Sequence, residues 1–431
     1  MPEKLRPVLI ITYYWPPSGG AGVQRWLKFA KYLPEFGWEP IILTVDPDFA
    51  TYPVTDYSLT DELSASIKVH KTPATDYFSI YKKDKSKIPS AGFANSVDIT
   101  LKGKLMRFIR GNFFIPDPRR GWNKYAYKKA CEIVETERIN HVITTSPPHS
   151  TQLIGLKLKK KYPAIKWIAD LRDPWTDIYY YKQFYPTFIS KGIDSALERK
   201  VLKKADRIIT VGASLKTLFS LKVKGIENKT EVVTNGYDEA DFAGLTSSSP
   251  EIFKISYIGT LSDAYPINAF LDALDIFRKN GNDFILRFIG TVSQKQKELI
   301  LSKTGNAIVE FIPSVEHASA IRLMLDTSLL LLIIPDHQSN KSIITGKLFE
   351  YLATRKPILC LGPADGDAAE IIIKCKSGIT VGYNDEEKIS KFLSNIGEYF
   401  WLSDKSAIED FSRLNLTKRL VAVLNSNENS G

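Results

Sequence analysis

Short apolar runs alternate with helical patterns along most of the chain. Val8–Thr12 has the apolar character of a strand buried on both faces, and residues 22–36 predict a helix with Val23, Trp26 and Leu27 on one face. Such alternation predicts parallel sheets covered by helices on both faces. Further predicted strands are Pro40–Val45, Val142–Thr145, Lys166–Ala169, Arg207–Val211, Glu231–Val233, Lys254–Ile258, Phe284–Ile289, Ala307–Ile312, Ser328–Ile334 and Pro357–Leu361.

The strand–helix pattern is interrupted at two places. Residues 48–118 follow neither pattern clearly, and the small, polar segment Asp241–Pro250 is the best linker candidate. At 431 residues the chain suits two domains. We therefore predict an α/β protein with two Rossmann-like domains, 1–240 and 251–400, followed by a helical segment, 401–431. Ligands bind at the carboxyl ends of such strands, so two facing domains would form an interdomain cleft.

Composition narrows the class of protein. The hydrophobic content is 44% and the charged content 25%, and the longest apolar run, Leu329–Ile334, is far too short to span a bilayer. Cys131, Cys360 and Cys375 are widely separated, which argues against a disulfide framework or a zinc site and favours the cytoplasm. The net charge of +10 suits an anionic membrane surface or a phosphorylated substrate. Nucleic acid is disfavoured because no binding motif for it is present.

The most informative motif is Thr345–Ala353, which opens a helix and leads into an apolar strand. Lys347 and Glu350 are three residues apart and share one face of the first turn. A helix N-terminus that begins near Gly346 and carries a lysine attracts phosphate. A carboxylate one turn further on can accept hydrogen bonds from a ribose diol. This arrangement suits a nucleoside diphosphate.

A glycine-containing loop, Tyr13–Gly22, follows the first strand. Gly20 and Gly22 would allow a ligand to approach the backbone closely. The loop is not the dinucleotide fingerprint, because Arg25 occupies the third glycine position. The alternative is a turn that binds nothing.

Two later loops carry candidate polar groups. In Thr144–Ser150, His149 would begin a helix, where a neutral imidazole can bind a sugar hydroxyl or cap the helix. In Asp170–Trp175, two carboxylates and an arginine end a strand. They form either an internal salt-bridge network or the acceptor side of a site, with Asp173 as the candidate base. The other histidines, at 70, 141, 317 and 337, have no comparable setting and are expected to be structural or solvated.

The segment Lys102–Pro116 is cationic and apolar together. Such a segment can lie at a lipid interface. The alternative is an ordinary surface helix whose apolar face packs on its own domain.

These motifs, taken in order, resemble those of the family 4 retaining glycosyltransferases of bacterial envelope polysaccharide synthesis, which have the GT-B fold. The resemblance implies a nucleotide-diphosphate sugar held by the second domain and an acceptor held by the first. No cluster of metal ligands is apparent in the sequence, so no metal or other cofactor is expected. Glu350 matches the ribose-binding glutamate of the family's paired-glutamate motif, whereas Ser342 stands at the first glutamate and Thr260 at the usual arginine. The resemblance rests on Val8–Gly22, Ser146–His149, Asp170–Trp175, Val233–Asp238, Tyr257–Leu261 and Gly346–Pro357.

The expected function is therefore metal-independent, hexosyltransferase-like transfer to a glycan or lipid-linked acceptor in polysaccharide or lipopolysaccharide synthesis, in the cytoplasm or at the inner face of the cell membrane. His149 would orient the donor sugar, Asp173 would serve the acceptor, and Lys347 would stabilise the leaving diphosphate. The expected donor-binding residues are Gly20, Gly22, Gly259, Gly346, Lys347, Glu350 and Ser342. A nucleotide-sugar epimerase and a catalytically inactive binding or scaffold protein are the rival interpretations.

Overall fold

A computed structural model describes residues 5–62, 67–77, 100–247, 250–304, 309–396 and 403–426. The chain divides into two compact units: unit 1 comprises Met1–Thr234 and Leu416–Gly431, and unit 2 comprises Asn235–Asn415. Residues 248–249 of the predicted linker, 307–308 of a predicted strand, and 401–402 and 427–431 of the predicted last segment lie outside the described residues. The predicted domain boundaries and cleft stay predictions.

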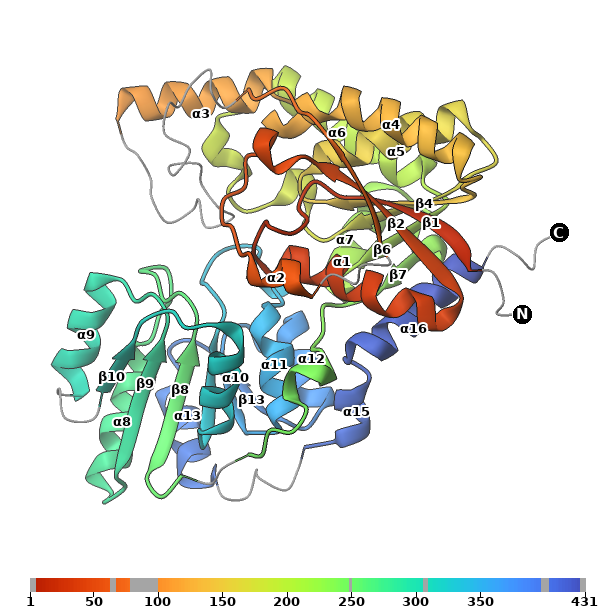
Figure 1. Ribbon diagram of the computed structural model, residues 1–431. Helices are drawn as coiled ribbons and strands as arrows, with labels where there is room; N and C mark the ends of the chain where they lie inside the picture. Colours follow the sequence, from red (N-terminus) through yellow and green to blue (C-terminus); the bar gives the residue numbers. More distant parts are fainter. Residues whose placement is uncertain are drawn as a thin grey trace. The chain divides into compact units, whose positions relative to one another are not determined.

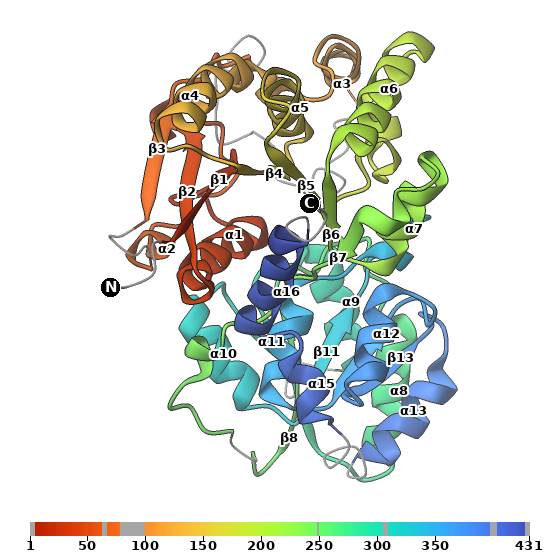
Figure 2. The same cartoon turned by 90° about the vertical axis from the view of Figure 1, so that its right-hand side faces the viewer.

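Unit 1 contains a parallel sheet of seven strands within the described residues, in the order β3-β2-β1-β4-β5-β6-β7 (Figures 1 and 2). Four consecutive residues of β1, Val8 to Ile11, are fully buried, as expected for a strand covered on both faces. The strands are β1 (Arg6–Ile11), β2 (Trp38–Val45), β3 (Lys68–Thr72), β4 (His141–Ser146), β5 (Lys166–Leu171), β6 (Arg207–Thr210) and β7 (Thr230–Val232).

Helices cover both faces of this sheet (Figure 2). Apolar side chains of α1 and α16 pack on one face, and those of α4 and α5 pack on the other. The helix α16 begins in unit 2 and belongs to unit 1 from Leu416 onward. The unit 1 helices are α1 (Ala21–Tyr32), α2 (Ser58–Asp61), α3 (Leu101–Phe113), α4 (Asn123–Thr136), α5 (Gln152–Lys161), α6 (Phe188–Lys204), α7 (Ala213–Lys222) and α16 (Arg413–Asn425).

Unit 2 has a parallel sheet of six strands in its described part, in the order β10-β9-β8-β11-β12-β13. Apolar residues of α8, α9 and α13 pack on one face, and those of α10, α11 and α12 pack on the other. The strands are β8 (Phe253–Ile258), β9 (Phe284–Ile289), β10 (Val309–Ile312), β11 (Leu329–Ile333), β12 (Ile358–Leu361) and β13 (Gly378–Val381). The helices are α8 (Asn268–Lys279), α9 (Gln294–Thr304), α10 (His317–Leu325), α11 (Gly346–Thr354), α12 (Asp367–Lys374), α13 (Glu386–Ser394) and α15 (Lys405–Glu409).

Each sheet reverses its strand order at one place. β1 pairs with both β2 and β4, and β8 pairs with both β9 and β11. In open sheets of this kind, ligands bind at the carboxyl ends of the strands beside such a reversal. The predicted fold class, two Rossmann-like α/β domains, is confirmed. None of the described helices is both long and apolar enough to cross a bilayer.

Candidate functional site

In unit 2 the strand order reverses beside β8. Lys347 of α11 lies over Gly259, the residue that follows β8. Gly259 has a φ of 120°, and a Cβ atom there would lie 2.9 Å from Lys347 Nζ. The ammonium group lies 4.1 Å from the centroid of the Tyr257 ring, within the range of a cation–π interaction. A glycine at 259 thus supplies both the backbone conformation and the space that this lysine occupies.

The helix α11 carries Lys347, and Tyr351 fixes it to the sheet. The hydroxyl group of Tyr351 accepts a hydrogen bond from Ile258 N at 3.0 Å and donates one to Leu331 O at 3.4 Å. These partners belong to β8 and β11, the two strands that flank the strand reversal. Because residues four apart share one helix face, the same contacts hold Lys347 over the strand ends. No role was predicted for Tyr351 from the sequence, although its spacing of four from Lys347 places both on one helix face.

The surroundings of Lys347 favour a bound anion. Burial lowers the pKa of Lys347 to about 7, and the nearby Glu350 carboxylate opposes that shift. The helix N-cap, Thr345, makes no side-chain capping hydrogen bond. Its buried Oγ1 has no hydrogen-bond partner within the described part of the chain. An anion near this helix start would stabilise the protonated lysine and add to the favourable helix-dipole interaction.

Glu350 lies on α11 and contacts His317, the first residue of α10. Its Oε1 lies 2.9 Å from His317 Nε2, and both side chains are partly exposed. His317, one of the histidines expected to be structural or solvated, thus has a specific partner. No sequence signal indicated this pair, because 33 positions separate the two residues. The contact orients the carboxylate that is predicted to bind ribose.

The positions that depart from the family pattern have local partners. Ser342 Oγ donates to Ser339 O at 3.1 Å, and Lys341 forms an ion pair with Asp365. Thr260 is exposed, and its carbonyl accepts a hydrogen bond from the Tyr257 hydroxyl at 2.7 Å. Gly346 is the first residue of α11. The predicted roles of Ser342 and Gly346 in donor binding stay predictions.

In unit 1, the glycine loop lies at the strand reversal beside β4. Gly20 is the N-cap residue of α1 and has a φ of 103°. A Cβ atom on Gly22 would lie 2.3 Å from Arg172 Nη1, so the guanidinium group of Arg172 occupies that space. Arg172 Nε also donates to Ser146 O at 3.0 Å. A packing role therefore accounts for Gly22, and a ligand role for either glycine stays a prediction.

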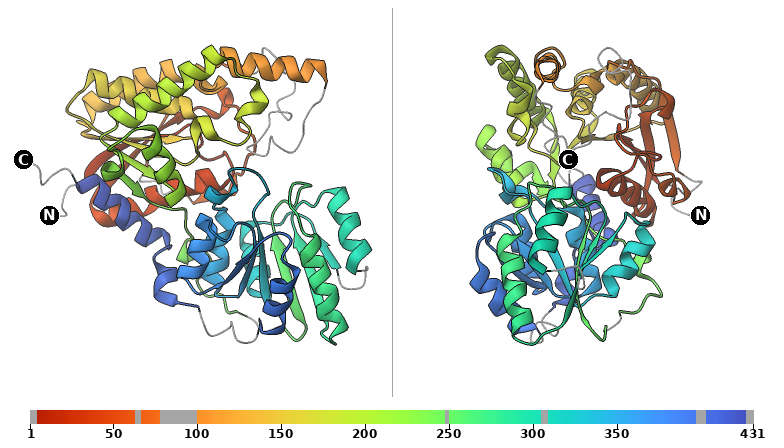
Figure 3. Two further views of the ribbon diagram at one scale, coloured as in Figure 1. Left: turned by 180° about the vertical axis from the view of Figure 1, so that it is seen from behind. Right: turned by 90° about the vertical axis from the view of Figure 1, so that its left-hand side faces the viewer.

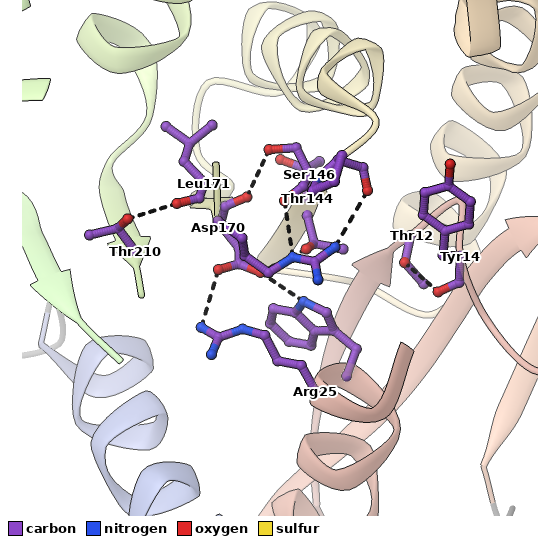
Figure 4. Close-up of polar contacts among 12 residues, drawn as sticks. Thr12, Tyr14, Arg25, Thr144, Ser146, Asp170, Leu171 and Thr210 are labelled. Carbon is purple, nitrogen blue, oxygen red and sulfur yellow. Dashed lines mark hydrogen bonds and ion pairs between the residues drawn. The ribbon is translucent and has the colours of Figure 1, made fainter. Parts of the chain in front are cut away.

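Asp170 is the centre of a buried polar network (Figure 4). Arg25 Nη2 lies 3.2 Å from Asp170 Oδ1, and Asp170 Oδ2 accepts hydrogen bonds from Trp26 Nε1 and Thr145 Oγ1. Arg25 Nη1 also donates to Thr234 O at 2.6 Å. Of the two interpretations offered for this loop, Asp170 fits the internal salt bridge. The arginine that breaks the dinucleotide fingerprint is its buried partner.

His149 and Asp173 lie in the loops after β4 and β5. His149 is the first residue of the 3-10 turn His149–Thr151. Its ring stacks on the ring of Trp175, with 4.9 Å between centroids and 13° between planes. Burial, with smaller effects of Lys222 and Arg172, lowers the pKa of His149 to about 3, so the imidazole is neutral at physiological pH. Burial also raises the pKa of Asp173, which Arg172 opposes. Their catalytic roles stay predictions.

The described residues contain no group of three or more His, Cys, Asp or Glu side chains that could hold a metal ion. No protein-family profile matches the sequence, and no curated protein matches it.

Solved structures do resemble the chain over nearly its whole length. A glycosyltransferase from Rickettsia africae is 15% identical with a TM-score of 0.61, and the match covers 99% of this chain and 100% of that one. HepE of Anabaena in complex with UDP is 12% identical with a TM-score of 0.61, covering 98% and 100%. A putative UDP-N-acetylglucosamine 2-epimerase from Listeria monocytogenes is 10% identical with a TM-score of 0.56, covering 99% and 98%. At these identities the likeness establishes the fold, which is GT-B.

Proposed function

We propose that the protein is a retaining glycosyltransferase that moves a sugar from a nucleotide-diphosphate sugar to a glycan or lipid-linked acceptor. The observation that carries this proposal is the Lys347 ammonium group over Gly259, with Glu350 one turn further along α11. A cation, an uncapped helix start and a carboxylate on one helix match the diphosphate and ribose of such a donor. Complexes of the similar HepE with UDP and glucose support the ligand class.

In the proposed reaction, the bond between the anomeric carbon and the diphosphate oxygen breaks as the acceptor oxygen bonds to the same carbon. Negative charge then grows on the leaving diphosphate. Lys347 and the first amides of α11 would stabilise that charge more strongly than they stabilise the bound donor. This preference for the transition state is the proposed source of catalysis, and it requires Lys347 to be protonated.

Two residues of unit 1, His149 and Asp173, have side chains suited to binding the donor sugar and to deprotonating the acceptor. The neutral His149 ring can bind a sugar hydroxyl through Nδ1, which is buried and has no hydrogen-bond partner among the described residues. The carboxylate of Asp173 would take the proton of the acceptor hydroxyl. Its raised pKa makes it a stronger base than an ordinary aspartate. We propose metal-independent hexosyl transfer in envelope polysaccharide or lipopolysaccharide synthesis, at the inner face of the cell membrane.

The second candidate function is nucleotide-sugar epimerisation, which the Listeria neighbour favours. Both functions use the donor site in unit 2, but an epimerase needs no acceptor. An inactive binding protein would hold the nucleotide sugar and release nothing. The three functions therefore differ in their products.

A donor screen followed by product analysis tests the proposal. A donor at a hundred times its dissociation constant should stabilise the folded protein by about 2.7 kcal/mol, visible as a thermal shift. The stabilising donor is then incubated without acceptor, and later with glycan or lipid-linked acceptors. Transfer or slow hydrolysis with retained configuration supports the proposal. Epimer formation without acceptor identifies the alternative, and no stabilisation by any nucleotide sugar contradicts the assigned site.

A further inference from the structure

The first three turns of α6 have buried polar residues, and the apolar residues at its start are exposed. Ser190, Asp194 and Glu198 are buried, whereas Phe188 is 91% exposed and Ile189 is 72% exposed. A surface helix of a globular protein normally shows the reverse arrangement. Large apolar side chains that are exposed together indicate an interaction site.

Buried hydrogen bonds hold α6 in this orientation. Asp194 accepts hydrogen bonds from Trp175 Nε1 at 2.8 Å and from the Tyr181 hydroxyl at 3.0 Å. Glu198 pairs with Lys222 at 2.6 Å. Rotating the helix to bury Phe188 and Ile189 would break these hydrogen bonds and leave polar groups without partners. The free-energy cost of that loss exceeds the gain from burying the two apolar side chains. These buried polar contacts therefore keep Phe188 and Ile189 exposed.

The helix α3 lies beside the start of α6 (Figures 2 and 3). Asn112 joins them: its Oδ1 accepts hydrogen bonds from Thr187 N at 2.7 Å and Ser190 Oγ at 2.5 Å. No residue of α3 is buried, and Leu101 is 86% exposed and Phe113 is 68% exposed. The helix packs on its own unit only in part: Arg110 lies over the Phe184 ring at 3.9 Å from its centroid, while Leu101 and Phe113 stay exposed. Both interpretations of Lys102–Pro116 stay open.

The two segments that contain these apolar residues carry charges of one sign. Segments 101–116 and 178–193 together contain six lysines and arginines and no aspartate or glutamate. Lys102, Lys104 and Lys191 are exposed, and none of the three forms an ion pair with another described residue. This combination of aromatic, aliphatic and cationic side chains matches the region where lipid headgroups meet acyl chains.

We propose that α3 and the first half of α6 form one docking surface for an anionic lipid bilayer. This α3–α6 surface comprises Leu101, Phe113, Phe188 and Ile189, which would enter the headgroup region, and Lys102 and Lys104, which would bind lipid phosphates. The inference deepens the proposed function, since a lipid-linked acceptor lies at such a bilayer. It extends the docking region from the basic helix to a second helix whose polar inner face fixes its direction.

Vesicle co-sedimentation of the full-length protein tests the surface. We expect binding to phosphatidylcholine vesicles that contain phosphatidylglycerol and little binding to phosphatidylcholine alone. The double variant Phe188→Ser/Ile189→Ser should weaken binding by about tenfold or more, because two apolar side chains no longer leave water. Lys102→Gln/Lys104→Gln should weaken it by about fivefold for each cation removed.

Matched controls separate docking from general surface effects. Leu221→Ser changes an apolar side chain of α7 that is 80% exposed, and Lys203→Gln/Lys204→Gln removes two exposed cations at the end of α6. Both controls should bind vesicles as the unchanged protein does, and all variants should keep the thermal shift with UDP. Equal vesicle binding by the Phe188/Ile189 variant and its control would overturn the proposal. So would an unchanged vesicle affinity with a loss of self-association in sedimentation velocity, which would assign the surface to a second copy of the chain. Either outcome leaves the donor site in unit 2 untouched.

Discussion

Lys347 combines a charge, a lowered pKa and a position at a helix start. Its ammonium group is stabilised by the Tyr257 ring and by Glu350 nearby, but burial outweighs both and lowers the pKa to about 7. Near neutral pH the side chain can therefore lose its proton, which an exposed lysine does not. A diphosphate that binds beside it would raise the pKa again, so donor binding and proton uptake are coupled.

This coupling predicts that donor affinity depends on pH. Because the lysine loses its proton as pH rises through about 7, and only the charged form attracts phosphate, affinity should fall above pH 7. The fall should approach tenfold per pH unit until the pKa of the complex is reached. Calorimetric titration with a nucleotide-diphosphate sugar at several pH values measures it. Lys347→Arg is the control, since its guanidinium stays charged, and a dependence that persists in this variant would contradict the assignment.

At the scale of single elements, α11 is positioned by one tyrosine that bridges two strands. Tyr351→Phe would leave the amide of Ile258, which bonds to the Tyr351 hydroxyl at 3.0 Å, without this acceptor. We expect a loss of about 1–3 kcal/mol in the free energy of unfolding. Donor affinity should fall as well, because Lys347 lies on the same face of the helix. Urea unfolding and calorimetry measure the two effects.

Tyr162→Phe provides the control for that substitution, since its hydroxyl bonds to the exposed Glu135 carboxylate. This change should leave both stability and donor affinity nearly unchanged. If Tyr351→Phe behaved in the same way, the tyrosine would not be what holds α11 in place.

Elements with strong apolar periodicity were predictable from the sequence, whereas edge strands were predicted only in part. Leu329–Ile333 is buried throughout, and its apolar run is unmistakable. The edge strand β3, Lys68–Val69–His70–Lys71–Thr72, is mostly polar because only one side pairs with a neighbour. The short edge strand β13 was missed as well. The other two edge strands in the described part of the chain, β7 and β10, were predicted, so an edge position weakens the strand pattern without always removing it.

Some residues of the candidate site were likewise predictable from the sequence, and others were not. Lys347 and Glu350 were found because helical spacing places them on one face. His317 and the Arg25–Asp170 pair were not, since those contacts join residues far apart in sequence. Local periodicity contains no information about such tertiary contacts.

At the scale of the whole molecule, the last helix completes the core of the first unit. Leu416, Leu420, Val423 and Leu424 of α16 are buried with Val8 and Trp26 of unit 1. Unit 1 thus depends on both ends of the chain, whereas unit 2 is one continuous segment.

This division predicts that damage to α16 acts on unit 1. Leu420→Ala should destabilise unit 1 by about 2–5 kcal/mol, as expected for a truncated buried leucine. Hydrogen exchange should show lost protection in β1 and β2 while β8 and β9 keep theirs. Leu331→Ala, in the core of unit 2, should give the reverse pattern. An equal loss in both units after either substitution would show that the units do not unfold separately.

The central claim is that Lys347 binds the diphosphate of a nucleotide at the start of α11. Calorimetric titration of UDP into the unchanged protein and Lys347→Met tests it most directly, with Lys295→Met on α9 as a control that removes an exposed charge from the same unit. Loss of a charge-assisted contact should cost about 1.5–3 kcal/mol of binding free energy, and the control should cost nothing. Equal UDP affinity in Lys347→Met and the unchanged protein, with the fold intact, would contradict the account.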